Sequence, residues 1–219
     1  SAVIPKQFIE IGGVPVIVRT VRAFLAVEEI DMAYVGIKPD WHEYTDELFE
    51  RFGIDKERVR VIDGGADRNG TVMNIAEAIV AEHGKNEGDI ILTHDAVRPF
   101  VTEKIIKDNI NAMREHSACG TYMPAADTII RSDGEKVKET LNRSELYQAQ
   151  TPQTFRLGDL RRNYYSLSEE QNKKLTDTCS VFTACNEDIY LVVGDALNFK
   201  ITTDSDLKMA NALAELSEK

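Results

Sequence analysis

Residues 58–76 read RVRVIDGGADRNGTVMNIA and contain three local signals in one short stretch. Arg58 to Ile62 is predicted to be a short strand, Gly64-Gly65 marks a turn, and a helix is predicted from Thr71. The apolar residues of this helix recur at helical spacing: Val72, Ile75, Ala76 and Ile79. A strand that turns through glycines into a helix is the repeating unit of an α/β domain.

The same alternation continues on both sides of this stretch. Upstream, a helix is predicted with Pro15 as its first residue, then a strand at Met32 to Ile37 and a helix from Pro39-Asp40. Downstream, the predicted elements are a strand at 89–93, a helix through 105–110, helices at 157–167 and from 176, strands at 189–193 and 199–202, and a last helix capped by Asp204 or Ser205. The pattern predicts one Rossmann-like α/β domain over residues 1–219, with a mostly parallel sheet and helices on both faces.

The alternation is interrupted between residues 121 and 150. Asp133-Gly134 lies between two β-prone runs, 128–131 and 136–140, which is the signal of a β-hairpin. We therefore expect a protruding hairpin arm at about residues 126–150. A lone two-stranded hairpin is marginal in water, so this arm needs a surface to pack on.

Composition excludes several classes of protein. The 219 residues carry a formal net charge of -11, and binding to nucleic acid requires a basic face, so no nucleic-acid partner is expected. No apolar run is long enough for a membrane span and no secretory signal is recognisable, so we expect a soluble, cytoplasmic protein without a membrane partner. Cys119, Cys179 and Cys185 are an odd number without CxxC spacing, which predicts reduced thiols rather than disulfides or a zinc site.

In an open α/β sheet, ligands bind beyond the carboxyl ends of the strands. The turn from Gly64 to Thr71 opens a helix there and could receive an anion or a base edge, although a plain glycine turn with a helix cap explains it equally well. Asp95 follows the most apolar strand and could hold Mg²⁺, with Arg98 either meeting a phosphate or forming a salt bridge back to Asp95. In so acidic a chain a phosphate site must be a local concentration of cations, for which the candidates are Lys6, Arg68, Arg98 and Lys200.

Several catalytic signatures are not found in the sequence. It contains no GxSxG elbow, HExxH pair or Walker loop, and His94 has no second His or Cys at ligand spacing, which disfavours hydrolase and zinc chemistry. A nicotinamide-dependent dehydrogenase would require GxGxxG followed by an acidic residue roughly 20 residues later, and this pair is not visible either.

Taken in order, short stretches along nearly the whole chain resemble the cytidylyltransferase family that includes the 2-C-methyl-D-erythritol 4-phosphate and ribitol 5-phosphate cytidylyltransferases. The matching stretches are 5–7 (PKQ), Gly64-Gly65 with Arg68 and Thr71, 95–99 (DAVRP), Asp127-Thr128, Asn142-Arg143, 150–153 (QTPQ), Thr176-Asp177 and 198–202 (NFKIT). Within the family, Phe8, the run 66–69 and the run 175–179 look closer to the ribitol 5-phosphate enzymes. The family's first strand and its Gly-rich loop would precede Pro5 and are not among these residues.

The resemblance implies an enzyme that joins CTP to a polyol phosphate and releases pyrophosphate, here giving CDP-ribitol, a precursor of teichoic acid or polysaccharide, with the methylerythritol reaction as the alternative. It implies catalytic roles for Lys6 and Lys200. It implies CTP binding by Lys6, Gly64, Gly65, Arg68, Thr71, Asp95 and Ala96. It implies acceptor-phosphate binding by Arg98, Thr128, Arg143 and Lys200. It further implies Mg²⁺, or another divalent cation, at Asp95 and a homodimer held by the arm; a non-catalytic nucleotide-binding module is the alternative from another class.

Overall fold

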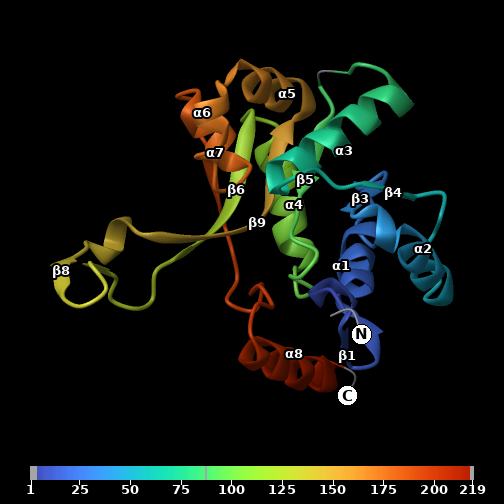
Figure 1. Cartoon of the computed structure of the whole chain (residues 1–219), viewed down its shortest axis with the longest axis horizontal. Helices are drawn as coiled ribbons and strands as arrows, with labels where there is room; N and C mark the ends of the chain where they lie inside the picture. The colour runs from blue at the N-terminus through green and yellow to red at the C-terminus, as the bar shows by residue number, and fades with distance from the viewer. Residues whose placement is uncertain (1–3, 87, 218–219) are drawn as a thin grey trace.

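A mixed four-stranded sheet in the order β10-β6-β9-β5 is the centre of the structure, a computed structural model that describes residues 4–86 and 88–217 (Figure 1). Its strands are β5 (Ile90–Thr93), β6 (Ala118–Pro124), β9 (Tyr147–Arg156) and β10 (Tyr190–Val193). β10 runs parallel to β6, whereas β9 runs antiparallel to both β6 and β5. A separate parallel pair joins β3 (Ala33–Ile37) to β4 (Val59–Asp63), and a short antiparallel pair joins β1 (Glu10–Ile11) to β2 (Val14–Pro15).

Successive residues of the central strands point to opposite faces of the sheet, and helices cover both faces (Figure 1). Ile91 and Ala118 enter a core shared with α3 (Arg68–His83), α5 (Leu157–Ser166) and α7 (Cys179–Ala184). The next residues in each strand, Leu92 and Cys119, face the other side, where α4 (Glu103–Ala112) and the residue after it, Met113, contribute apolar side chains.

The β3–β4 pair has its own apolar core. It is covered by α1 (Val16–Leu25), α2 (His42–Arg51) and the short turns η1 (Lys6–Phe8) and η2 (Pro39–Trp41), with Phe8, Ile17, Ile37, Phe49 and Val59 buried among them. α8 (Asp204–Ser217) packs through Ala210 on Ile11 and Val16, close to the start of the chain. α6 (Glu169–Asn172) is a single turn with a capping box at Ser168.

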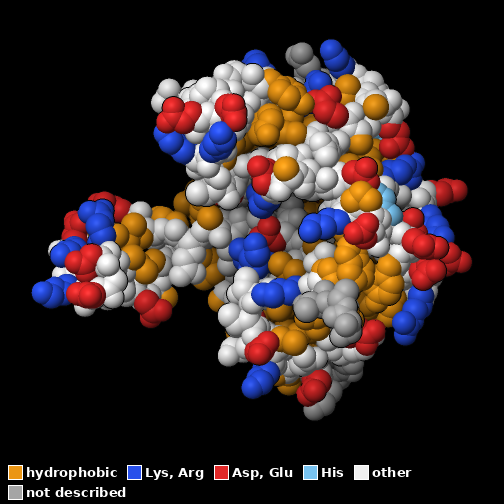
Figure 2. All heavy atoms as spheres, viewed as in Figure 1, with side chains coloured by type: hydrophobic (Ala, Val, Ile, Leu, Met, Phe, Trp, Pro, Cys, Tyr) orange, Lys and Arg blue, Asp and Glu red, His pale blue; other side chains and the backbone are white. Residues whose placement is uncertain are grey.

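The predicted hairpin is present as β7 (Ile130–Ser132) paired antiparallel with β8 (Val137–Thr140), followed by η3 (Arg143–Glu145). The arm extends away from the rest of the chain and carries mixed charges with an apolar patch between them (Figures 1 and 2). Ile130 is 46% exposed and Val137 is 62% exposed, so the arm buries little of its own apolar surface within one chain.

The expected Rossmann-like α/β class with helices on both faces is confirmed, but the pairing of the sheet is more mixed than the sequence indicated. The reason is β9, which was not predicted because its buried centre, 150–154, reads QTPQT and lacks an apolar strand signal. The predicted strand at 199–202 is wrong: this segment is an irregular loop, held by the Ile201 amide bonding the Val97 carbonyl oxygen at 2.9 Å. In the part of the chain that the structure describes, no helix combines the length and the apolar character needed to cross a membrane.

The three cysteines differ in their surroundings, which generates a labelling prediction. Burial raises the pKa of the Cys119 and Cys179 thiols to about 12, so almost no thiolate forms at mildly alkaline pH. Cys185 is only partly buried. We expect iodoacetamide to label the native protein at Cys185 alone and the denatured protein at all three cysteines, as read by peptide mass spectrometry. Native labelling of Cys119 or Cys179 would contradict the described packing, and Cys185→Ser is the control that should abolish native labelling.

Candidate active site

Three cationic side chains converge on the carboxylate of Asp95. Arg68 Nε lies 3.3 Å from Oδ1, while Arg98 Nε and Lys200 Nζ lie 3.2 Å and 3.3 Å from Oδ2. Burial of this side chain, which is 13% exposed, disfavours its charged form, but the charges of Arg68, Lys200 and Arg98 outweigh that cost, so the pKa of Asp95 lies below its ordinary value. We call Asp95 with these three cations the Asp95 cluster.

The fold brings the four residues of the Asp95 cluster together from three segments. β5 delivers Asp95 to the carboxyl edge of the central sheet, and a tight turn, in which the Arg98 amide bonds the Asp95 carbonyl oxygen at 3.0 Å, returns Arg98 to it. Arg68 is the first residue of α3, and Lys200 belongs to the loop before α8. The predicted cations Arg68, Arg98 and Lys200 therefore meet at one point, and the salt bridge considered for Asp95 and Arg98 is present.

The turn from Gly64 to Thr71 closes on itself. The Gly65 amide donates to Thr71 Oγ1 at 2.9 Å, and a Cβ on Gly65 would lie 2.3 Å from the carbonyl carbon of Gly70, so only glycine fits there. Asp67 caps the helix by accepting a bond from the Gly70 amide at 2.7 Å. This cap starts the helix at Arg68 rather than at the predicted Thr71, and it places the Arg68 side chain at the helix end next to Asp95.

Lys6 and Ala96 are not members of the Asp95 cluster, although Ala96 directly follows Asp95 in the chain. Lys6 Nζ donates to the Thr202 carbonyl oxygen, which brings the first described residues beside the loop that carries Lys200. The Ala96 carbonyl oxygen accepts from Thr20 Oγ1 at 2.9 Å, so α1 supports the turn between Asp95 and Arg98.

Thr128 and Arg143 are the predicted residues that the structure places apart from the Asp95 cluster. Both belong to the arm or its base, which extends away from the central sheet (Figure 1). Arg143 Nη1 donates to the Ala126 carbonyl oxygen at 2.8 Å. Thr128 and Arg143 are both exposed. Within one chain they do not contribute to the charge around Asp95.

Sequence reasoning missed the residues that support Arg68 from the far side. Arg68 Nη1 donates to Thr178 Oγ1 at 2.9 Å. Gln153, which is almost fully buried, donates from Nε2 to Asp177 Oδ2 at 2.6 Å and accepts from the Thr178 amide at 3.2 Å. Gln153 and Asp177 lie in two stretches that carried the family resemblance, 150–153 and Thr176-Asp177. This resemblance was the only sign in the sequence that they matter for the site, because their partners are remote in sequence.

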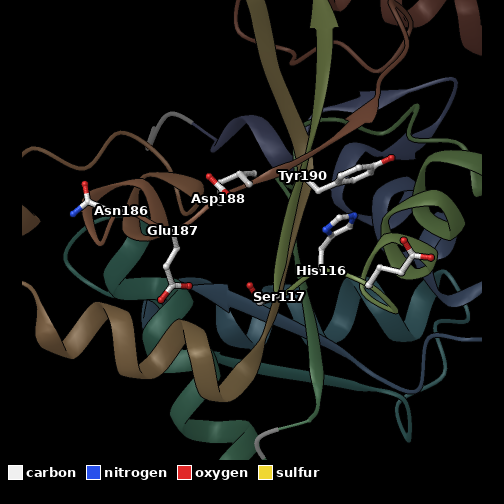
Figure 3. Close-up of a pocket in the computed structure, with 8 residues that line it drawn as sticks. His116, Ser117, Asn186, Glu187, Asp188 and Tyr190 are labelled. Atoms are coloured by element: carbon white, nitrogen blue, oxygen red, sulfur yellow. The ribbon is translucent and has the colours of Figure 1, made fainter.

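Two cavities flank the sheet at different ends. A cavity of about 940 Å³ lies between β3 and β5, is lined by apolar residues of α1 and α3, and includes Arg68 and Asp95 in its polar lining. A smaller one of about 560 Å³ lies at the amino ends of β6 and β10 (Figure 3). Glu187 and Asp188 contribute to its lining, as do His116 and Tyr190, whose rings stack 4.1 Å apart. Only the first cavity borders residues predicted to act.

The donor set at Asp95 fits a cation that is held mainly by a substrate. Among the described residues no group of three or more His, Cys, Asp or Glu side chains could hold a metal ion by itself. Mg²⁺ commonly takes one or two carboxylates together with substrate phosphates, and Asp95 supplies one carboxylate at the correct edge of the sheet. His94 is unsuited to ligate because both ring nitrogens are engaged, by Thr151 Oγ1 and by the Arg98 carbonyl oxygen.

The Asp95 cluster predicts a large loss of stability for Asp95→Asn. Arg98 is buried, and removing the shared counter-charge should lower the free energy of unfolding by about 3 kcal/mol at neutral pH, measured by urea denaturation. Because the pKa of Asp95 is depressed, this stabilisation exists above the ordinary Asp pKa and is lost as pH falls through the lower folded-state pKa, so the two proteins should converge in strong acid.

Asp108→Asn is the matched control for this prediction. Asp108 pairs with Lys104, whose side chain is 81% exposed, so the change should cost less than about 1 kcal/mol. An Asp95→Asn protein that is no less stable than this control would show that the Asp95 cluster does not hold its three segments together.

Comparison with known proteins places this arrangement in a family. Residues 1–215 match the family described as IspD, 2-C-methyl-D-erythritol 4-phosphate cytidylyltransferase. Among solved structures, a 4-diphosphocytidyl-2C-methyl-D-erythritol synthase is 30% identical, with a TM-score of 0.83 and coverage of 96% of this chain and 95% of that one. The corresponding Anaerococcus prevotii synthase is 29% identical, with a TM-score of 0.81 and coverage of 95% and 93%. The Francisella tularensis cytidylyltransferase is 27% identical, with a TM-score of 0.82 and coverage of 95% and 93%.

These matches do not support the expected closer relation to the ribitol 5-phosphate enzymes. Because the family match spans nearly the whole chain, this chain is a nucleotidyltransferase that belongs to the 2-C-methyl-D-erythritol 4-phosphate cytidylyltransferase family.

Proposed function

We propose that the chain transfers a cytidylyl group from CTP to 2-C-methyl-D-erythritol 4-phosphate and releases pyrophosphate. The observation that carries this proposal is the convergence of Arg68, Arg98 and Lys200 at the carboxyl edge of the sheet, in a chain whose net charge is -11. The family match and the names of the similar structures support the choice of CTP and the methylerythritol acceptor.

The chemistry is an in-line displacement at the α-phosphorus of CTP. A phosphate oxygen of the acceptor forms the new P–O bond, and the bond from the α-phosphorus to the bridging oxygen breaks, its electron pair leaving with pyrophosphate. The acceptor needs no general base, since the second pKa of a phosphate monoester is about 6 and the nucleophile is already ionised at neutral pH. The protein must therefore bring two polyanions together and neutralise the charge that develops.

The described residues divide this task. The backbone of the Gly64 to Thr71 turn, with Ala96, would read the cytosine, and Lys6 would meet the triphosphate. Lys200 and Arg98 would hold the acceptor phosphate, which can take the place of Asp95 as a partner for their charges. Mg²⁺, held by Asp95 and phosphate oxygens, would supply further neutralisation of the triphosphate.

The acceptor is tested by offering each polyol phosphate separately. Purified protein is given CTP, Mg²⁺ and either 2-C-methyl-D-erythritol 4-phosphate or ribitol 5-phosphate, and pyrophosphate release is measured. We expect turnover with the methylerythritol substrate. Turnover with ribitol 5-phosphate alone would restore the interpretation based on Phe8 and the runs 66–69 and 175–179. Binding of CTP without pyrophosphate release from either acceptor would favour a non-catalytic nucleotide-binding module.

We further propose that the enzyme acts as a homodimer whose arm reaches the partner's site. The arm exposes Ile130 and Val137, and the edge strand β10 exposes Val193 at 66%, which leaves apolar surface that a second copy could cover by two-fold symmetry. The arm also carries Thr128 and Arg143 away from the Asp95 cluster of their own chain. In a dimer, Arg143 would meet the acceptor phosphate bound to the partner, where its planar guanidinium can bind bidentately.

A complementation experiment tests this sharing of sites. Lys6→Ala and Arg143→Ala should each lower turnover by orders of magnitude while the fold is retained, because each removes a cation that faces phosphate. Mixing the two variants under conditions of subunit exchange should produce heterodimers with one intact site, so that activity rises well above either parent.

Arg131→Ala is the matched control for the arm, because Arg131 forms an exposed pair with Glu139 and faces no proposed substrate. It should retain turnover alone and in mixtures. If differently tagged subunits exchange and no activity returns, Arg143 does not act across the interface. A monomer in sedimentation would remove the basis of the proposal.

A further inference from the structure

His94, the first residue after β5, makes contacts that the proposed reaction does not use. Its Nδ1 lies 2.9 Å from Thr151 Oγ1 and its Nε2 lies 3.0 Å from the Arg98 carbonyl oxygen. The imidazole also packs against Phe24 of α1, with ring centroids 4.8 Å apart. These contacts tie the residue before Asp95 to three separate elements: β9, α1 and the end of the Asp95–Arg98 turn.

The partners of His94 fix its tautomer. The Arg98 carbonyl oxygen can only accept a hydrogen bond, so Nε2 must carry the hydrogen. With the hydrogen on Nε2, Nδ1 of the imidazole keeps a lone pair that faces the Thr151 hydroxyl oxygen 2.9 Å away. The Thr151 hydroxyl therefore donates to Nδ1 and is left free to accept, and it does accept, from the Asp95 amide at 3.2 Å.

The result is a directed chain of hydrogen bonds around the Asp95–Arg98 turn. It runs from the Asp95 amide to Thr151 Oγ1, from that hydroxyl to His94 Nδ1, and from His94 Nε2–H to the Arg98 carbonyl oxygen. Arg98 in turn donates from Nη1 to the Asn198 carbonyl oxygen at 2.8 Å, two residues before Lys200. The main chain at both ends of the turn is thus restrained by one imidazole.

We propose that His94 is a positioning residue of the active site. As the Nε2–H tautomer it links Thr151 to the Arg98 carbonyl oxygen. Through these two bonds it holds Asp95 and Arg98 in the orientation in which their side chains meet. The inference deepens the proposed function, on which its kinetic test rests. It follows from geometry: the side chains of Asp95 and Arg98 are joined at 3.2 Å. The imidazole is bonded both to the Arg98 carbonyl oxygen and to the hydroxyl that holds the Asp95 amide.

The first experiment does not depend on activity. Protein labelled with ¹⁵N-histidine and ¹⁵N-arginine contains four labelled imidazoles, and the nitrogen shifts of His94 report its tautomer directly. The arginine label makes the Arg98 Nε–H signal observable in the same sample. We expect a single Nε2–H tautomer near neutral pH. Thr151→Val, which removes the hydroxyl and keeps the shape, should shift the His94 Nδ1 resonance and speed the hydrogen exchange of Arg98 Nε–H. An Nδ1–H tautomer, or a Thr151→Val protein with an unchanged Arg98 signal, would overturn the proposal.

The second experiment uses kinetics. His94→Phe keeps an aromatic ring and removes both hydrogen bonds, and we expect kcat to fall about 10- to 100-fold, the scale found for groups that orient a ligating or reacting side chain. His94→Gln, whose amide can donate toward the Arg98 carbonyl, should recover part of that loss. The double variant His94→Phe with Thr151→Val should be no slower than His94→Phe alone, because both changes break the same chain.

His116→Phe is the matched control, since His116 stacks on Tyr190 at the opposite end of the sheet (Figure 3). Its kcat should equal that of the unaltered protein. If the His94 variants lose thermal stability while kcat per folded molecule matches this control, His94 only stabilises the fold and the proposal fails. If the unaltered protein shows no cytidylyl transfer, the proposed function fails, and the tautomer and the Arg98 exchange still decide whether His94 orients the turn.

Discussion

The rest of the site depends on the contact between one carboxylate and three cations. Asp95 is delivered by β5, and its partners come from the start of α3, from the next turn and from the loop before α8. Without the carboxylate the three cations would repel one another. The negative charge of Asp95 allows them to lie close together. The strand, the helix cap at Asp67 and the 198–202 loop all serve to bring these charges to one edge of the sheet.

This arrangement suits a reaction between two polyanions. The proposed substrates, CTP and a polyol phosphate, would repel each other and be repelled by a protein of net charge -11, so a local concentration of cations would be needed to hold them in line. The cations are partly neutralised by Asp95 before any ligand binds. A phosphate bound here would take over cations that Asp95 now pairs with, and the proposed Mg²⁺ would then balance the charge of the carboxylate.

Support for the Asp95 cluster comes mainly from uncharged groups. Gln153 fixes the Asp177–Thr178 turn that receives Arg68, and His94 with Thr151 fixes the main chain at Asp95 and Arg98. Gln153 and Thr151 are buried, and each of the three side chains makes at least two hydrogen bonds. Such groups lose little freedom when substrate binds, because their geometry is already set by the fold.

The sequence by itself determined the α/β alternation, the hairpin arm and the candidate cations, since helical spacing, an Asp-Gly turn and charges after strands are local signals. It predicted the start of the helix after Gly64-Gly65 at Thr71 instead of Arg68. The apolar pattern of the helix begins only at Val72, whereas the cap at Asp67 starts the helix earlier. Only the tertiary structure decided that β9, whose centre is polar, lies buried and antiparallel between β5 and β6. It also decided that Asp95 is shared by three cations, Arg68, Arg98 and Lys200. Thr128 and Arg143, in contrast, lie on the arm or at its base. The physical reason is that strand pairing and charge clustering join residues far apart along the chain, and no spacing within one segment encodes which segments will meet.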